Sequence, residues 1–251
     1  TSAINTEKDV RTCMEKSGVD ILDFVLEPLA SAYSVLDTNE RDLGVVLIDI
    51  GGGTTDVIIY RDGGVMHAGA IPIGGTNITN DIAYGLQTTR EQAELIKCKH
   101  GSARSALADP EENITIAGTG GRESKTVSQN MLASIIEPRM DEIFRLAKNE
   151  INKSNYKGEN TFGIVLTGGG SRLNHVEDLA QDIFKQPIKI GKPELQGGIS
   201  ERVNNPRFST AVGLIKYGIT NWQDLDYGDE SITSIVQDFY SKLKKLFNNW
   251  Y

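Results

Sequence analysis

The stretch from Leu43 to Tyr60 constrains this chain most, because two apolar runs flank three consecutive glycines, Gly51 to Gly53. Glycine tolerates positive φ angles and leaves room for backbone N–H groups to approach an anion. The pattern therefore predicts two strands that fold back on each other through a phosphate-binding turn. An ordinary hairpin with a Gly-rich turn is the alternative, but an aspartate before the turn and Thr-Thr-Asp after it favour the phosphate interpretation.

Polar side chains around this turn have the chemistry of a nucleotide site. Asp49, at the end of the first apolar run, is placed to hold a hydrated Mg²⁺ ion, and Thr54 and Thr55 offer hydroxyls to phosphate oxygens. The turn has neither the Gly-Lys-Ser/Thr ending of a Walker loop nor the G-x-G-x-x-G spacing of dinucleotide-binding folds. Both of those phosphate-binding classes are therefore excluded.

Three more segments carry signals that are weak singly. Residues 162–167 read as a short strand that breaks into glycines before an amphipathic pattern reaching about Phe184, and Gly74-Gly75-Thr76 precedes a helical pattern. Glu94 and Lys97 lie three residues apart and share one helix face. A surface ion pair is the alternative interpretation of that pair.

In this order the segments resemble the ATP-binding loops of the actin, Hsp70 and hexokinase superfamily. The resemblance implies an α/β fold of the actin-like (ribonuclease H-like) ATPase type, with ATP and Mg²⁺ as cofactors. The implied contacts are a second phosphate loop at Gly51, Gly52, Gly53, Thr54 and Thr55, a β-phosphate contact at Gly74 and Gly75, ribose and base contacts from Glu94 and Lys97, and an adenosine loop at Gly168, Gly169, Gly170, Ser171 and Arg172.

Two segments resemble the helices that connect the halves of this superfamily. In the first, Pro28 stands in the first helical turn and small side chains follow, and the second runs from Asn205 to Gly218. The resemblance implies that Glu27 positions or deprotonates the attacking water, and a helix-capping role is the alternative. Whether ATP is hydrolysed or only sensed stays open, because both need the same loops.

Within the superfamily, the sequences of residues 27–33 and 71–83, together with the tail, are similar to those of the bacterial cell-division protein FtsA family. The resemblance implies a protein that polymerises and tethers FtsZ filaments to the cytoplasmic face of the inner membrane at the division site. It also implies that Arg139, in a Glu-Pro-Arg run, binds the C-terminal FtsZ peptide. An intramolecular pair with Asp141 or Glu142 is the alternative. An Hsp70-like chaperone ATPase, a sugar kinase, or a rod-shape or pilus-assembly scaffold are rival functions.

The tail gives an independent argument. Apolar residues from 232 to 251 recur at threes and fours and fill one helical face. Three lysines and one acid give this segment a local charge of 3 − 1 = +2, against −8 for the whole chain. An acidic linker at 219–231 precedes it, and the combination favours an anionic membrane surface over docking on the chain itself or on a partner helix. The expected membrane-facing residues include Phe239, Leu243, Leu246, Phe247 and Trp250.

The patterns predict one subdomain interrupting another. Residues 1–73 and 159–218 form the expected core subdomain (IIA), and 74–158 form an inserted smaller α+β subdomain (IIB). Helices are expected at 7–17, 28–36, 76–86, 90–99 and 128–154, strands at 19–26, 44–50, 55–60, 64–73 and 162–167, and a β-like patch at 113–127.

Composition limits the function classes. The pI is about 5.0, and outside the tail there is no basic stripe, so nucleic-acid binding is disfavoured. Two distant cysteines, Cys13 and Cys98, indicate reduced thiols in the cytoplasm, and the three histidines are scattered without metal-ligand spacing.

One expected part of the superfamily pattern is missing. The first phosphate hairpin, a D-x-G-[ST] turn, does not occur in the 48 residues before Asp49, and the chain starts at Thr1. We therefore expect the C-terminal part of a longer protein, and weak or no ATP binding by the chain alone.

Overall fold

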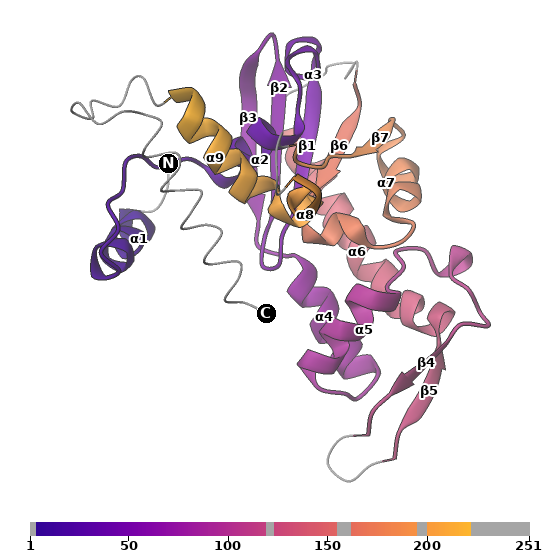
Figure 1. The fold of residues 1–251 in the computed structure, drawn as a ribbon. Coiled ribbons are helices and arrows are strands. Elements are labelled where there is room, and N and C mark those ends of the chain that lie inside the picture. The colour runs from indigo at the N-terminus through magenta and orange to yellow at the C-terminus, as the bar shows by residue number, and fades with distance from the viewer. Residues whose placement is uncertain (1–3, 119–122, 155–161, 195–199, 222–251) are drawn as a thin grey trace. The chain divides into compact units, whose positions relative to one another are not determined.

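The computed structural model describes residues 4–118, 123–154, 162–194 and 200–221 (Figure 1). Contacts divide the chain into two units, one of residues 1–23 with 218–251 and one from Phe24 to Tyr217. The predicted linker lies largely, and the predicted membrane helix entirely, outside the described residues. In the smaller unit, α1 (Ile4–Lys16) confirms the first predicted helix.

The predicted strand at 19–26 is wrong. These residues have no regular secondary structure, and Val19, Leu22, Phe24 and Leu26 are 40–49% exposed. A short run rich in apolar residues fits a strand, but a strand forms only when a neighbour pairs with its backbone. No described strand pairs with this segment.

A five-stranded mixed sheet forms the centre of the larger unit, in the order β3-β2-β1-β6-β7. The strands are β1 (Val45–Ile50), β2 (Thr55–Arg61), β3 (Gly64–Ile71), β6 (Ile164–Thr167) and β7 (Ile188–Ile190). The first three are antiparallel, whereas β1, β6 and β7 are parallel neighbours. Every residue of β1 is buried, as expected for an apolar strand covered on both faces.

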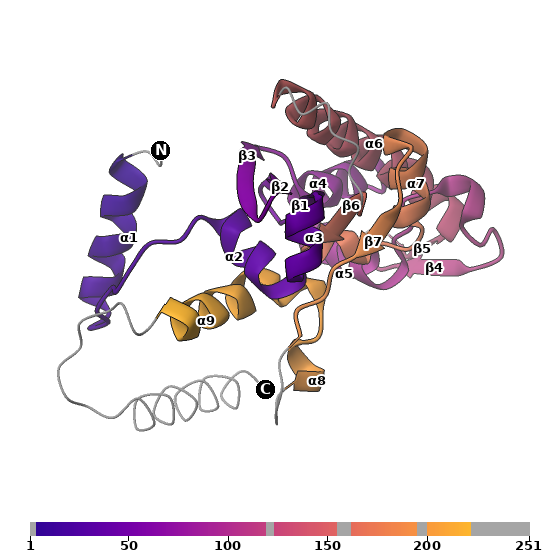
Figure 2. The ribbon, with the colours of Figure 1, turned by 90° about the horizontal axis from the view of Figure 1, so that it is seen from above.

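Helices cover both faces of the sheet (Figure 2). On one face, α2 (Glu27–Val35) packs through Ala32 and Val35 against Leu47 and Ile58. The other face carries α6 (Gln129–Lys153) and α7 (Val176–Phe184). A last long helix, α9 (Ser209–Asn221), lies beside α2 and follows the 3-10 turn η3 (Pro206–Phe208).

Between β3 and β6 the predicted helices are confirmed, and two short antiparallel strands form in the predicted β-like patch. The elements are α4 (Gly75–Gly85), α5 (Arg90–His100), η1 (Ser105–Leu107), β4 (Asn113–Ile116) and β5 (Lys125–Ser128), followed by α6. Because α6 runs from α4 back to the sheet, the residues from Phe24 to Tyr217 form one unit by contacts. The subdomain limits at 74 and 158 stay predictions.

Short elements that were not predicted include α3 (Thr38–Leu43), η1, β7 and α8 (Ser200–Val203). The first had a readable signal, because Asp37 and Glu40 form a capping box at its start. Strand β7 has only three residues, too few for a periodic pattern.

Candidate nucleotide-binding site

Strands β1 and β6 bring two glycine loops together. Asp49 and Thr167 are register partners in this parallel pair, so the loop after each strand leaves from the same edge of the sheet. Gly168 has a φ of 81°, and a Cβ there would collide with Asp49 Oδ1 and the Ile50 carbonyl. The loop at 168–170 therefore packs against the end of β1, from which the β1–β2 turn continues.

The start of α4 supports the β1–β2 turn from behind. The N–H groups of Gly75 and Thr76 donate to the carbonyls of Gly51 and Gly52 at 2.9 and 2.8 Å. A Cβ on Gly74 would lie 2.7 Å from the Gly51 carbonyl oxygen, which explains the glycine. These two N–H groups are thus already bonded, so α4 orders the turn and does not offer them to an anion.

The outer part of the turn is open. Gly52 and Gly53 are exposed, and within the described residues their backbone N–H groups have no protein acceptor. A Cβ on Gly53 or on Gly169 would meet nothing within 4 Å. The turn and the 168–170 loop therefore offer the free donors and the space that a phosphate chain needs.

Three carboxylates gather behind the turn. Asp49 and Asp56 are 5% and 7% exposed, and Glu27 at the start of α2 is close enough to act on both electrostatically. Burial, together with Glu27, raises the pKa of Asp49 and the pKa of Asp56 to about 6 each. A cation would relieve this repulsion, so the donor set fits a hydrated Mg²⁺ ion.

In the part of the chain that the structure describes, no three His, Cys, Asp or Glu side chains are arranged to bind a metal directly. That finding is compatible with an ion held through water and phosphate oxygens, the usual arrangement for Mg²⁺. Pro28 stands at the start of α2 as predicted, and α2 has no side-chain cap, so the capping alternative for Glu27 is not observed.

Glu94 and Lys97 form the predicted pair, but it is more than a surface contact. Lys97 Nζ donates to Glu94 Oε2 at 2.7 Å, to Thr79 Oγ1 at 2.8 Å and to the Gly75 carbonyl at 3.0 Å. Burial opposes ionisation of Glu94, yet hydrogen bonds from Lys97 and Thr79 lower its pKa. The pair fastens α5 to the first turn of α4, beside the glycine turn.

The remaining predicted residues fall into two groups. Thr54 is exposed and donates to Asp56 Oδ2 at 3.3 Å. Arg172 is also exposed, and its charge acts on Cys98, whose pKa is raised by burial and by Glu94. In contrast, the hydroxyl of Thr55 donates to the Ile73 carbonyl at 2.8 Å, and that of Ser171 donates to the Gly168 carbonyl at 2.8 Å. Both of those hydroxyls order the loops from inside.

Sequence reasoning missed three hydroxyl residues. Ser31 donates to Asp49 Oδ2, Thr210 lies against Ser31, and Thr79 joins the Glu94–Lys97 pair. For Thr79 a signal existed, because it lies one helical turn after Gly75 and faces the same way. Ser31 and Thr210 are 179 positions apart, and no local pattern joins them.

Arg139 lies on another surface, where α6 meets α4. It forms ion pairs with Asp81, at 2.6 Å, and with Glu142, whereas Asp141 pairs with Arg145. The alternative of an intramolecular pair is therefore confirmed for Glu142 and wrong for Asp141. Asp81, 58 positions away, is a partner that the sequence did not predict.

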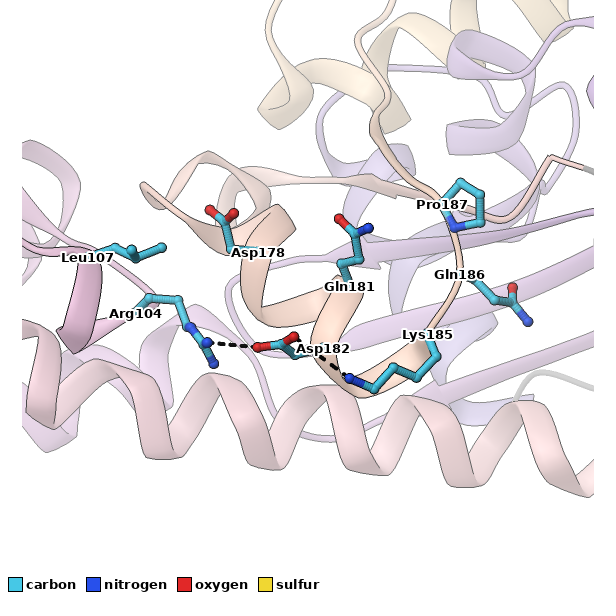
Figure 3. A pocket seen from close by; sticks show the side chains of 8 residues that line it. All are labelled: Arg104, Leu107, Asp178, Gln181, Asp182, Lys185, Gln186 and Pro187. Carbon is cyan, nitrogen blue, oxygen red and sulfur yellow. Dashed lines mark ion pairs between the residues drawn. The ribbon is translucent and has the colours of Figure 1, made fainter.

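A separate cavity of about 680 Å³ lies between η1, α7 and the loop that leads to β7 (Figure 3). Asp182 stands between two cations there, 2.7 Å from Arg104 and 3.8 Å from Lys185. The residues that line it are Arg104, Leu107, Asp178, Gln181, Asp182, Lys185, Gln186 and Pro187. None of them belongs to the predicted nucleotide site.

Among the described helices, none is both long and apolar enough to cross a bilayer.

Comparison with known proteins identifies the family. A family model described as cell division protein FtsA matches residues 46–213. The cell division protein FtsA of Pseudomonas aeruginosa is 42% identical over 224 residues, which are 89% of this chain and 54% of that protein. Its Escherichia coli K12 counterpart is 36% identical over 250 residues, 97% of this chain and 59% of that protein. The chain thus spans about half the length of the curated relatives it matches.

Solved structures agree on the fold. MreB5 of Spiroplasma citri bound to ADP superposes with a TM-score of 0.72 at 18% identity, over 90% of this chain and 68% of that one. The PilM–PilN type IV pilus biogenesis complex gives a TM-score of 0.66 at 19% identity, over 85% and 57%. The described residues form part of an actin-like ATPase fold, and the chain belongs to the cell division protein FtsA family.

Proposed function

We propose that this chain forms one side of the ATP site of a division-ring adaptor, which polymerises and links FtsZ filaments to the cytoplasmic face of the inner membrane. The carrying observation is the packing of the 168–170 loop against Asp49 and Ile50, the two residues that lead into the β1–β2 turn. Open space at Gly53 and Gly169 and the free N–H groups of the turn support phosphate binding.

Each residue has a role in this proposal. Gly52, Gly53 and Thr54 contact phosphate oxygens, Asp49 holds Mg²⁺ through water, and the cluster of Glu94, Lys97 and Arg172 takes the adenosine. Glu27, exposed at the start of α2, positions a water molecule. Any ATPase activity is weak in this proposal and depends on Glu27. Bound Mg²⁺ supplies neutralisation of phosphate charge.

The partner sites complete the proposal. Arg139 exchanges its pairs with Asp81 and Glu142 for an acidic group of the FtsZ peptide, and its partial exposure of 28% makes that exchange feasible. The amphipathic tail, from 232 to 251, binds an anionic membrane surface and carries other divisome proteins and the filament to it. Family membership favours this role over a chaperone ATPase, a sugar kinase or another scaffold.

The test uses a completed chain, defined as the full chain fused to the part of the Pseudomonas aeruginosa relative that it does not match. Binding of a fluorescent ADP analogue is measured with Mg²⁺ and with EDTA. We expect saturable, Mg²⁺-dependent binding to the completed chain and much weaker binding to the 251-residue chain alone. A folded completed chain that binds no nucleotide would contradict the proposal.

A further inference from the structure

The carboxylate of Asp49 is held by hydroxyls from two different helices. Ser31 Oγ, on α2, donates to Asp49 Oδ2 at 2.5 Å and lies 3.0 Å from Thr210 Oγ1, on α9. Ser31 has one hydroxyl hydrogen, which it gives to Asp49, and the Thr210 hydroxyl also acts on the Asp49 carboxylate as a hydrogen-bond partner. The two hydroxyls and Asp49 form a hydroxyl chain that joins α2 to α9.

This hydroxyl chain lies in a tightly packed crossing. Ser31 is 0% exposed, and a Cβ on Gly213 would collide with the Ala30 carbonyl, so α2 and α9 touch through their backbones. One residue before Thr210, Ser209 Oγ lies 2.5 Å from Thr167 Oγ1, at the end of β6. The start of α9 is thereby fastened to the ends of both β1 and β6.

We infer that Ser31 and Thr210 are positioning residues, which orient the Asp49 carboxylate for the cation and couple cation binding to the crossing of α2 and α9. This inference rests on the proposed nucleotide site. Asp49 differs here from Asp56, which among the described side chains accepts a hydrogen bond from the exposed Thr54 at 3.3 Å. A buried donor in fixed geometry holds its acceptor in one orientation, and that orientation is what an ion held through water requires.

Cation binding is coupled to the helix crossing because α2 and α9 are packed too closely to move independently. Because α2 and α9 touch at Ala30 and Gly213, a shift of the Asp49 carboxylate toward a cation must either stretch the hydroxyl chain or move the helices. The coupling is reciprocal, so a change in the crossing of α2 and α9 alters the orientation of the Asp49 carboxylate through the same hydroxyls.

The experiment measures ADP affinity of the completed chain with Mg²⁺ and with EDTA. Ser31→Ala removes the donor to Asp49, and Ser34→Ala is the matched control, because Ser34 is buried on the same helix and bonds only to the Ser31 carbonyl through its hydroxyl. Thr210→Val and Thr210→Ser form a second pair, of which the serine keeps the hydroxyl.

We expect Ser31→Ala to reduce the Mg²⁺-dependent gain in ADP affinity by about tenfold, since a hydrogen bond to a charged group contributes at least that factor. Affinity in EDTA should not change. Thr210→Val should show a smaller loss that Thr210→Ser restores, and Ser34→Ala should match the unsubstituted chain.

The outcomes distinguish the positioning role of Ser31 and Thr210 from the nucleotide site itself. If Ser31→Ala keeps the full Mg²⁺ effect, or loses affinity equally in EDTA, the positioning role is refuted while the nucleotide site stands. An equal loss in Ser34→Ala also refutes it, because that result means general loosening of α2. If the unsubstituted completed chain binds no ADP, both the site and the positioning role are refuted.

Discussion

Asp49 and Thr167 stand opposite each other at the ends of β1 and β6, although 118 positions separate them in the chain. The arrangement places the loop that begins at Gly168 against the end of β1. Gly168 lies against the Asp49 side chain and the Ile50 carbonyl, and Gly170 lies against the Ile50 side chain, so a Cβ at either glycine would collide.

The glycines of the 168–170 loop should separate stability from binding. Gly168→Ala places a Cβ against Asp49 at a positive φ and should destabilise the completed chain by about 1–3 kcal/mol. Gly169→Ala meets no atom within 4 Å, so its thermal midpoint should not change, while ADP affinity should fall because the methyl group enters the proposed site. Thermal unfolding and ADP titration check both variants. Unchanged affinity in Gly169→Ala would argue against a nucleotide at this loop.

Stability should depend on pH through Asp49. Its pKa in the folded state, about 6, is above the usual aspartate value of 3.8, so between about pH 4 and pH 6 the folded state binds more protons than the unfolded state. The free energy of unfolding should therefore fall as pH rises through this window, and above the window the full loss from ionising Asp49 is present. Asp49→Asn should be more stable than the unsubstituted chain at pH 7.5 by on the order of 1–3 kcal/mol in EDTA.

Urea unfolding at pH 4.5 and pH 7.5 measures this difference. Asp62→Asn, which removes an exposed carboxylate from the β2–β3 turn, is the control and should leave the pH dependence intact. If Asp49→Asn gains nothing at pH 7.5, the carboxylate does not carry the cost that burial and Glu27 impose on it.

Arg139→Glu should abolish binding of an FtsZ C-terminal peptide without unfolding the chain, because it turns a cationic contact into a cluster of acids with Asp81 and Glu142. Arg145→Glu provides the control on the same helix, since Arg145 is 67% exposed and pairs with Asp141 one turn away. Peptide anisotropy and circular dichroism measure the two effects. Equal affinities for the two variants would remove Arg139 from the peptide site.

Removal of residues 232–251 should abolish co-sedimentation with anionic liposomes, because that segment carries the apolar face and the local positive charge. Leu243→Asp should weaken sedimentation strongly, whereas Ser241→Asp adds the same charge to the polar face and should weaken it only slightly. Liposomes of neutral lipid provide the test of charge. Full sedimentation of the shortened chain would exclude the tail as the membrane anchor.

Elements with a strong local pattern were predictable. The turn at Gly51–Gly53, the buried strand before it and the long helix from Gln129 needed only apolar periodicity and glycine chemistry. The segment at 19–26 is also rich in apolar residues but formed no strand, since pairing needs a neighbour that the described residues do not supply. A local pattern states what a segment can form, and its partners decide whether it does.

By itself, the sequence determined the glycine loops, their order along the chain and the family, because those features are carried by residue types at fixed spacing. Only the tertiary structure decided which groups face each other. It turned the Thr55 hydroxyl inward, paired Arg139 with Asp81, and brought Ser31 and Thr210 to the same carboxylate. Such contacts depend on the packing of segments far apart in the chain, and no spacing between neighbouring residues encodes them.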